Sequence, residues 1–152
     1  MRHLSRIAAL CTAAWLAGFL SGIAPACAQS PVGNPLARPR VFAYSRMTPK
    51  TAPNGAVSRG VFAGTLATGE AVGAHETMQP AGARPVPLHR IRHSEIIVVR
   101  QGTVAFEHDG LSERAGPGDI VYVAYGTLHR IRNVGEGPAR YVVIQIGGDT
   151  RR

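Results

Sequence analysis

Cysteine and lysine are nearly absent from this chain. It has two cysteines in 152 residues, Cys11 and Cys27, and Lys50 is its single lysine among 17 basic residues. So few cysteines exclude a disulfide-rich scaffold, while 45% apolar residues exclude a disordered or collagen-like chain. The formal charge of +8 leaves anionic ligands or surfaces open as partners. Because arginine so strongly outnumbers lysine, we attribute the basic balance mainly to genome composition.

The first 28 residues are organised like a bacterial secretory signal peptide. A short positive part contains Arg2 and Arg6, and an apolar stretch follows over residues 7–20. Residues 26–28 (Ala-Cys-Ala) then form a small-x-small cleavage site. We therefore expect cleavage after Ala28, a periplasmic or secreted protein, and no stable membrane insertion once the signal peptide is removed.

Two alternatives fit the same segment. Apolar character continues to about Ala24, which is nearly long enough for an uncleaved membrane anchor. Lipidation at Cys27 is the second, although the leucine that usually precedes such a site is missing. After cleavage both cysteines are lost, so the mature chain has no disulfide, thiol nucleophile or thiolate metal site. It must fold on hydrophobic burial alone, which a chain of this size can do.

No segment shows the 3.6-residue periodicity of an amphipathic helix. Residues 29–40 are rich in proline and polar residues and predict a flexible leader. From residue 41 to residue 152, short β-branched segments alternate with turn residues, which predicts one all-β domain, a sandwich or a barrel. The Asp109-Gly110 pair predicts a type I′ hairpin turn. The expected strands cover residues 57–63, 71–78, 88–92, 95–100, 103–108, 120–123, 128–132 and 140–146.

Alternation along three of these segments places two histidines and a glutamate on inward faces. The arginines on either side of Ile91 point to solvent, so His89 and Ile91 point inward. The same argument turns His129 inward, and Glu95 shares the inner face of its own segment. Both faces of residues 95–100 are largely apolar, which indicates a second sheet on one side and favours a subunit contact on the other.

Two imidazoles and a carboxylate inside a small barrel are costly unless they are paired or bind a metal. Two histidines and one carboxylate with open positions form the facial arrangement of non-haem Fe(II) sites, and the same donors suit Mn, Ni, Co or Zn. A buried His–Glu cluster without metal is the alternative that these residues leave open.

The same residues carry a family resemblance. His89, Glu95 and Gly102 match the first motif of the cupin superfamily, with the required six residues between the last two. The second motif is matched at the required spacing by four residues: Gly118, Gly126, His129 and Asn133. The stretch from Pro87 to Ile146 therefore resembles a cupin, which implies an antiparallel β-barrel of jelly-roll type.

The chain departs from the cupin pattern at three places. Gly82 stands one residue too far from His89, and Ala124 replaces a proline. More seriously, Ile91 takes the place of the second histidine. Cupins usually bind metal through three histidines and the glutamate, so the resemblance implies a divalent metal held by His89, Glu95 and His129 alone. His93 is a possible replacement ligand, and a position pointing out of the barrel is its alternative.

The resemblance implies two classes of function. One is a metal-dependent enzyme acting on a small molecule, with dioxygenase, isomerase or decarboxylase chemistry; the other is a binding module for a sugar or an organic acid, which the apolar Ile91 favours. A homodimer is compatible with both. Nucleic acid is not expected as a partner, because no aromatic platform is interleaved with the basic residues.

Further polar residues are weaker candidates. We expect His75 to be structural and His108 to be exposed. The candidates for lining the cavity are Ile91, Tyr122, Tyr125 and Gln145.

Overall fold

The computed structural model of the chain describes residues 33–150, which all lie in one compact unit, Pro31–Arg152. The expected signal peptide lies outside the described residues. No helix within residues 33–150 is long and apolar enough to span a membrane. The described elements, in chain order, are η1 (Tyr44–Arg46), β1 (Pro49–Thr51), β2 (Val57–Thr65), β3 (Ala71–Gln79), β4 (His89–Arg90), β5 (Ser94–Gln101), β6 (Val104–His108), β7 (Leu111–Ala115), β8 (Ile120–Val123), β9 (Leu128–Asn133) and β10 (Ala139–Ile146).

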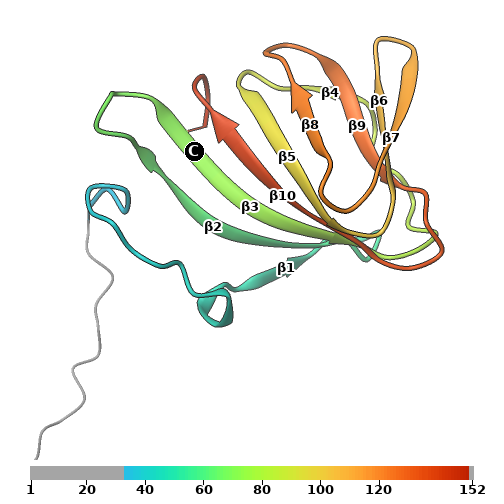
Figure 1. Cartoon of the computed structure of the whole chain (residues 1–152), viewed down its shortest axis with the longest axis horizontal. Coiled ribbons are helices and arrows are strands. Elements are labelled where there is room, and N and C mark those ends of the chain that lie inside the picture. Colours follow the sequence, from blue (N-terminus) through green and yellow to red (C-terminus); the bar gives the residue numbers. More distant parts are fainter. Residues whose placement is uncertain (1–32, 151–152) are drawn as a thin grey trace, which may run out of the picture. The chain divides into compact units, whose positions relative to one another are not determined.

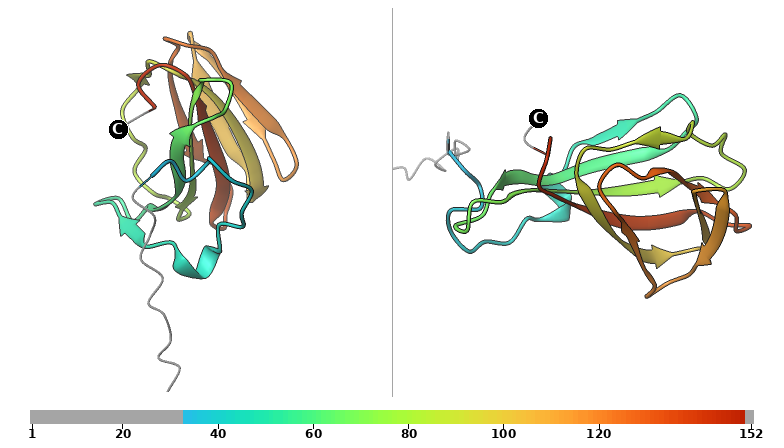
Figure 2. Two further views of the ribbon diagram at one scale, coloured as in Figure 1. Left: turned by 90° about the vertical axis from the view of Figure 1, so that its left-hand side faces the viewer. Right: turned by 90° about the horizontal axis from the view of Figure 1, so that it is seen from above.

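Two antiparallel sheets build the domain (Figure 1). The larger sheet has the strand order β1-β2-β3-β10-β5-β8, and the smaller has the order β4-β9-β6-β7. The two sheets face each other at one end, and β2 and β3 extend beyond that end (Figure 2). The expected all-β fold with an antiparallel, jelly-roll type barrel is confirmed.

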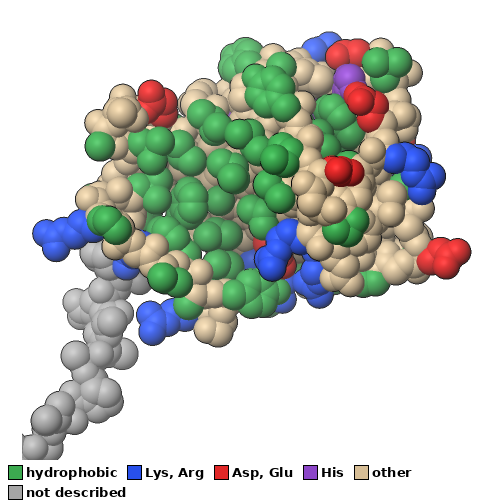
Figure 3. Space-filling model, in the orientation of Figure 1, with side chains coloured by type: hydrophobic (Ala, Val, Ile, Leu, Met, Phe, Trp, Pro, Cys, Tyr) green, Lys and Arg blue, Asp and Glu red, His purple; other side chains and the backbone are tan. Residues whose placement is uncertain are grey.

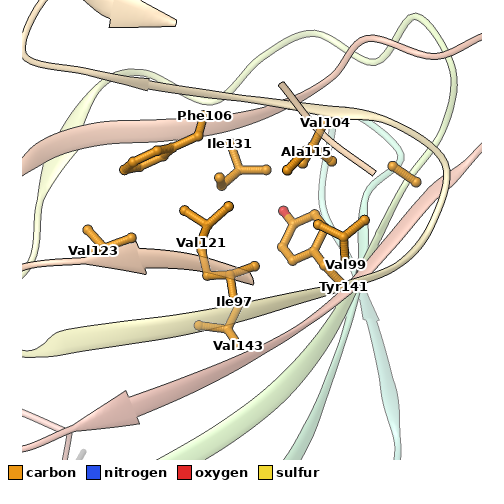
Figure 4. Packing of buried hydrophobic residues seen from close by; sticks show 11 residues of the cluster. Ile97, Val99, Val104, Phe106, Ala115, Val121, Val123, Ile131, Tyr141 and Val143 are labelled. Carbon is orange, nitrogen blue, oxygen red and sulfur yellow. The ribbon is translucent and has the colours of Figure 1, made fainter. Parts of the chain in front are cut away.

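The core lies between the two sheets. Along β5, Ile97 and Val99 are buried and alternate with half-buried residues on the outer face. Val104 and Phe106 reach toward them from the smaller sheet (Figure 4). Burial of these side chains provides the main hydrophobic stabilisation of a domain that has no disulfide.

The outer face of the larger sheet is also apolar. Ile96 on β5 pairs with Ile144 on β10 and with Tyr122 on β8, so the three side chains form one row across the sheet. Ile120 and Tyr122 are exposed. Figure 3 shows a broad area of hydrophobic side chains over this region. The expectation that both faces of β5 are apolar is therefore confirmed.

Local turn chemistry explains one hairpin. Asp109 and Gly110 both have positive φ angles, 47° and 80°, as a type I′ turn requires. They join β6 to β7, where His108 pairs with Leu111. The predicted turn is therefore confirmed.

The segment before Glu95 corrects the sequence prediction. A strand was expected over residues 88–92, but β4 contains only His89 and Arg90, and a bend follows it. His89 is exposed, whereas alternation placed it inside. A two-residue strand does not impose alternation on the residues around it, which explains the error.

Candidate functional site

A cavity of about 310 Å³ lies between the two sheets. Four elements of the barrel, β3, β5, β9 and β10, contribute to its wall, together with the segment around β4. Its polar lining residues are His75, Thr77, Gln79, His89, Glu95, His129, Tyr141 and Gln145. The three expected metal ligands therefore line one cavity.

His89 and His129 are neighbours across the β4–β9 pair. They are directly opposed in the register, and their ring centroids are 4.8 Å apart. The Nδ1 atom of His89 lies 3.3 Å from the carbonyl oxygen of Pro87, and that of His129 lies 3.1 Å from the carbonyl oxygen of Thr127. A carbonyl oxygen only accepts, so each Nδ1 carries a proton, and whenever the ring is neutral its lone pair is on Nε2. This is the tautomer that a metal ligand needs when it binds through Nε2.

Glu95 is held by its neighbours at one oxygen. Its Oε1 accepts hydrogen bonds from Nε2 of His93 at 3.0 Å and from Nε2 of Gln145 at 3.3 Å. Its Oε2 lies 3.7 Å from Nε2 of His129. Burial alone would raise the pKa of Glu95, but hydrogen bonds with His129, His93 and Gln145 outweigh it and lower the pKa to about 2. Glu95 therefore presents an ionised carboxylate with Oε2 on the histidine side.

His93 connects Glu95 to the end of the chain. Its Nδ1 lies 2.7 Å from Oδ1 of Asp149, and its Nε2 faces Glu95. An ionised carboxylate can only accept a hydrogen bond, so a hydrogen bond to each of the two carboxylates needs an N–H group on each ring nitrogen. His93 meets this requirement as an imidazolium. Burial opposes the charge, but hydrogen bonds with Asp149 and Glu95 raise the pKa of His93. His93 therefore has no free nitrogen for a metal in this arrangement, and it orients the ligand Glu95 instead.

Close backbone contact holds Asp149 in place. The amide of Asp149 donates to the carbonyl oxygen of Arg92 at 3.1 Å. Gly148 has φ of +54°, and a Cβ atom there would lie 1.5 Å from the same oxygen. Only glycine allows this approach, so Gly148 fixes the chain where Asp149 can reach His93.

The imidazoles of His89 and His129 and the carboxylate of Glu95 are groups that bind divalent metals, but the structure does not bring all three to one point. Among residues 33–150, no group of three or more His, Cys, Asp and Glu side chains lies close enough to hold a metal ion. Glu95 and His129 approach to 3.7 Å, and the His89 and His129 rings lie 4.8 Å apart. Of the three, His89 alone is exposed, and it lies on the two-residue strand β4.

The expected cavity-lining residues divide into two pairs. Ile91 and Gln145 line the cavity. Tyr122 and Tyr125 do not, and their exposed fractions are 63% and 66%. Tyr122 lies on β8 between Val121 and Val123, whose side chains are buried, so its own side chain points outward. The prediction for these two tyrosines is wrong.

Three further residues of the cavity were not predicted as site residues. His75, Thr77 and Gln79 alternate along β3 with residues of the outer face, such as Glu76. The pKa of His75 is lowered, chiefly by burial. The charge of Glu95 raises it in part, and the charge of His93 lowers it slightly further. The available signal was alternation along residues 71–78, which places His75 and Thr77 on one face.

His108 also differs from its prediction. It is half-buried rather than exposed, and its ring stacks on Phe106 with 4.3 Å between centroids. Its Nε2 lies 2.7 Å from Oε1 of Glu113. His108 pairs with His129 in the β6–β9 register but does not line the cavity between the sheets.

Comparisons with known proteins agree with this fold. Residues 74–145 match the family model described as a cupin domain. This part of the barrel is therefore similar to a cupin domain. The match includes His89, Glu95 and His129, and it begins within β3 and ends within β10.

Several solved structures share the fold over about 70% of the chain. An RmlC-like cupin from Shewanella frigidimarina is 18% identical, with a TM-score of 0.59, over 73% of this chain and 94% of that chain. KdgF from Halomonas sp. is 20% identical, with a TM-score of 0.60, over 70% of this chain and 94% of that chain. A predicted oxalate decarboxylase from Thermotoga maritima is 21% identical, with a TM-score of 0.56, over 70% of this chain and 98% of that chain. Identities this low show the shared fold alone, and a comparison with curated proteins gave no match.

Proposed function

We propose that this cupin binds a divalent metal through His89, Glu95 and His129 and acts on a small molecule in its cavity. The observation that carries the proposal is the position of the Nδ1 atom of each histidine. Each Nδ1 is hydrogen-bonded to a backbone carbonyl, so each ring would bind a metal through Nε2, and the Nε2 atom of His129 lies 3.7 Å from Oε2 of Glu95. Fe(II), Mn, Ni and Zn all suit two imidazoles and one carboxylate.

The other residues of the cavity bind and orient the small molecule. A bound metal would act as a Lewis acid on an oxygen atom of that molecule. Gln145 holds one oxygen of Glu95, so that Oε2 remains for the site. Ile91 supplies an apolar wall where other cupins have a histidine. A volume of about 310 Å³ restricts the ligand to a small molecule, because small-molecule sites span about 300–1,000 Å³.

A metal-free binding cavity is the second candidate function. It is favoured by the lack, among residues 33–150, of three donors close enough to hold a metal ion and by the apolar residue at position 91. In that case Glu95 and His129 would recognise a sugar or an organic acid directly through hydrogen bonds.

Thermal unfolding with added metal separates the two candidates. Fe(II) under anaerobic conditions, Mn, Ni and Zn would each be added to metal-stripped protein. The proposal predicts that at least one metal raises the Tm of the wild type but not of His129→Gln, because a ligand that binds only the folded state stabilises it. His108→Gln is the matched control, because its imidazole lies outside the cavity, and it should respond like the wild type. An equal response in all three proteins would contradict the site.

We also propose a periplasmic or secreted location and a homodimer. The location is supported by the signal-like residues 1–28. The dimer is supported by the apolar row on the outer face, where Tyr122 and Ile120 are exposed beside β5.

A further inference from the structure

A second, larger hollow lies beside β2. It has a volume of about 640 Å³ and is lined mainly by the segment that precedes β1 and by β2 itself. We call it the basic groove, and its defining residues are Arg40, Arg46, Lys50, Ser58, Gly60 and His75.

The groove carries positive charge without compensation. Arg40, Arg46 and Lys50 line it, and no aspartate or glutamate does. Within residues 33–150, none of these three cations forms a salt bridge, whereas Arg130 and Arg132 are both paired with Glu107. The guanidinium of Arg40 lies over the Phe42 ring, 5.5 Å from its centroid, which leaves its charge without a carboxylate partner. The groove therefore concentrates cations that no carboxylate neutralises, unlike the paired arginines of the smaller sheet.

The segment that carries two of these cations is fixed to the sheet. The side chain of Asn34 accepts a hydrogen bond from the amide of Thr65 at 3.2 Å and donates one to its carbonyl oxygen at 2.5 Å. Farther along, the Phe42 ring lies on the Phe62 ring at 5.0 Å, and the Tyr44 hydroxyl donates to Glu76 at 3.3 Å. These contacts hold the backbone on either side of Arg40.

His75 joins the groove to the cavity of the proposed metal site. This residue lines both hollows. In the β2–β3 register it is opposite Gly60, which has no side chain, and a Cβ atom there would meet nothing within 4 Å. The absence of a side chain at position 60 leaves open space next to His75 on the groove side.

We propose that the groove and the cavity form one extended site for a small organic anion, whose charged group binds Arg40, Arg46 and Lys50 while the remainder reaches past His75. The inner half of this site rests on the proposed function, and the outer half does not. Carboxylates and phosphate monoesters share the chemistry that these cations would recognise. A neutral His75 offers one donor and one acceptor to the middle of such a molecule.

Calorimetric titration of the full-length protein tests the proposal. The probes are citrate, 3-phosphoglycerate, inorganic phosphate and neutral glucose, each added to metal-stripped protein and to protein loaded with metal. We expect one of the two organic anions to bind better than glucose and inorganic phosphate, and which one binds identifies the charged group. Binding should weaken as salt is raised, because exposed charges are screened.

Variants locate the binding. The double variant Arg46→Gln/Lys50→Gln should weaken binding about tenfold, which corresponds to about 1.4 kcal/mol. Arg84→Gln/Arg114→Gln removes two exposed cations outside the groove and should change affinity less than about twofold by the same arithmetic. Gly60→Leu fills the space beside His75 and should weaken the organic anion more than inorganic phosphate.

Three results would overturn the proposal: equal binding of glucose and the anions, loss of binding in the control double variant as large as in the groove variant, or no organic anion bound in either metal state. Failure of the metal site leaves a different pattern. Anions would then still bind metal-stripped protein and still respond to Arg46→Gln/Lys50→Gln, while no metal would bind.

Discussion

Replacing Asp149 with asparagine removes the charge that supports His93 but keeps an oxygen acceptor. The His93 side chain is 10% exposed and the Asp149 side chain 33%, so the pair lies partly within reach of solvent. A hydrogen bond to a charged group contributes about 1.5–3 kcal/mol, and partial exposure reduces this, so we expect a loss of about 1–2 kcal/mol.

The loss should depend on pH in one direction. Hydrogen bonds with Asp149 and Glu95 raise the pKa of His93 above its ordinary value of 6.5. The stabilisation is therefore fully present below pH 6.5 and disappears as the pH rises through the higher pKa of the folded state. Asp149→Asn should be destabilised at pH 5.5 and close to the wild type at pH 9.

Urea unfolding at the two pH values measures this difference. Glu136→Gln is the matched control, because it removes an exposed carboxylate from a loop outside the network, and it should have little effect at either pH. An equal loss of stability in Asp149→Asn at pH 5.5 and pH 9, or no loss at pH 5.5, would refute the assignment of His93 as an imidazolium between two carboxylates.

Three other predictions concern packing and assembly. Gly148→Ala should lower the free energy of unfolding by more than about 1 kcal/mol, because its Cβ would collide with the carbonyl oxygen of Arg92; wild-type stability in urea would contradict this. Ile97→Ala should cost about 2–5 kcal/mol, since Ile97 is 1% exposed in the core, while Leu111→Ala, 60% exposed, should cost less than about 0.5 kcal/mol in the same assay. Tyr122→Arg should convert the proposed dimer to a monomer in light scattering after size exclusion, and an unchanged dimer mass would exclude this face as the interface.

Much of the barrel follows from residue alternation and turn chemistry. The inward side chains of β5 and β9 were predicted because apolar and polar residues alternate there, and the β6–β7 turn was predicted because Asp109-Gly110 suits positive φ angles. β7 was missed because four of its five residues are exposed, so no apolar alternation marks it. β1 was missed because its three residues are all exposed at the edge of the sheet.

Less of the site than of the fold could be predicted from the sequence. His89, Glu95 and His129 line one cavity, but no three donors within residues 33–150 lie close enough to hold a metal ion, so the predicted ligand set stays a prediction. The tertiary fold decides the rest: Asp149 reaches His93 through a tight backbone contact 56 residues away along the chain. Tyr122 was misassigned because residues near a motif need not point to the same face of the sheet as the motif residues. That His75 lines both hollows could not be predicted either, because it depends on the pairing of His75 with Gly60 across the sheet.

The metal content of the purified protein tests the central claim most directly. Full-length wild type, Glu95→Gln, His129→Gln and the control His108→Gln would be incubated with Fe(II), Mn, Ni and Zn, dialysed, and measured by mass spectrometry. The account predicts close to one metal ion per chain in the wild type and in His108→Gln, and a fall of about tenfold or more in the other two variants. A folded wild type that retains none of the four metals, or equal metal content in all four proteins, would contradict it.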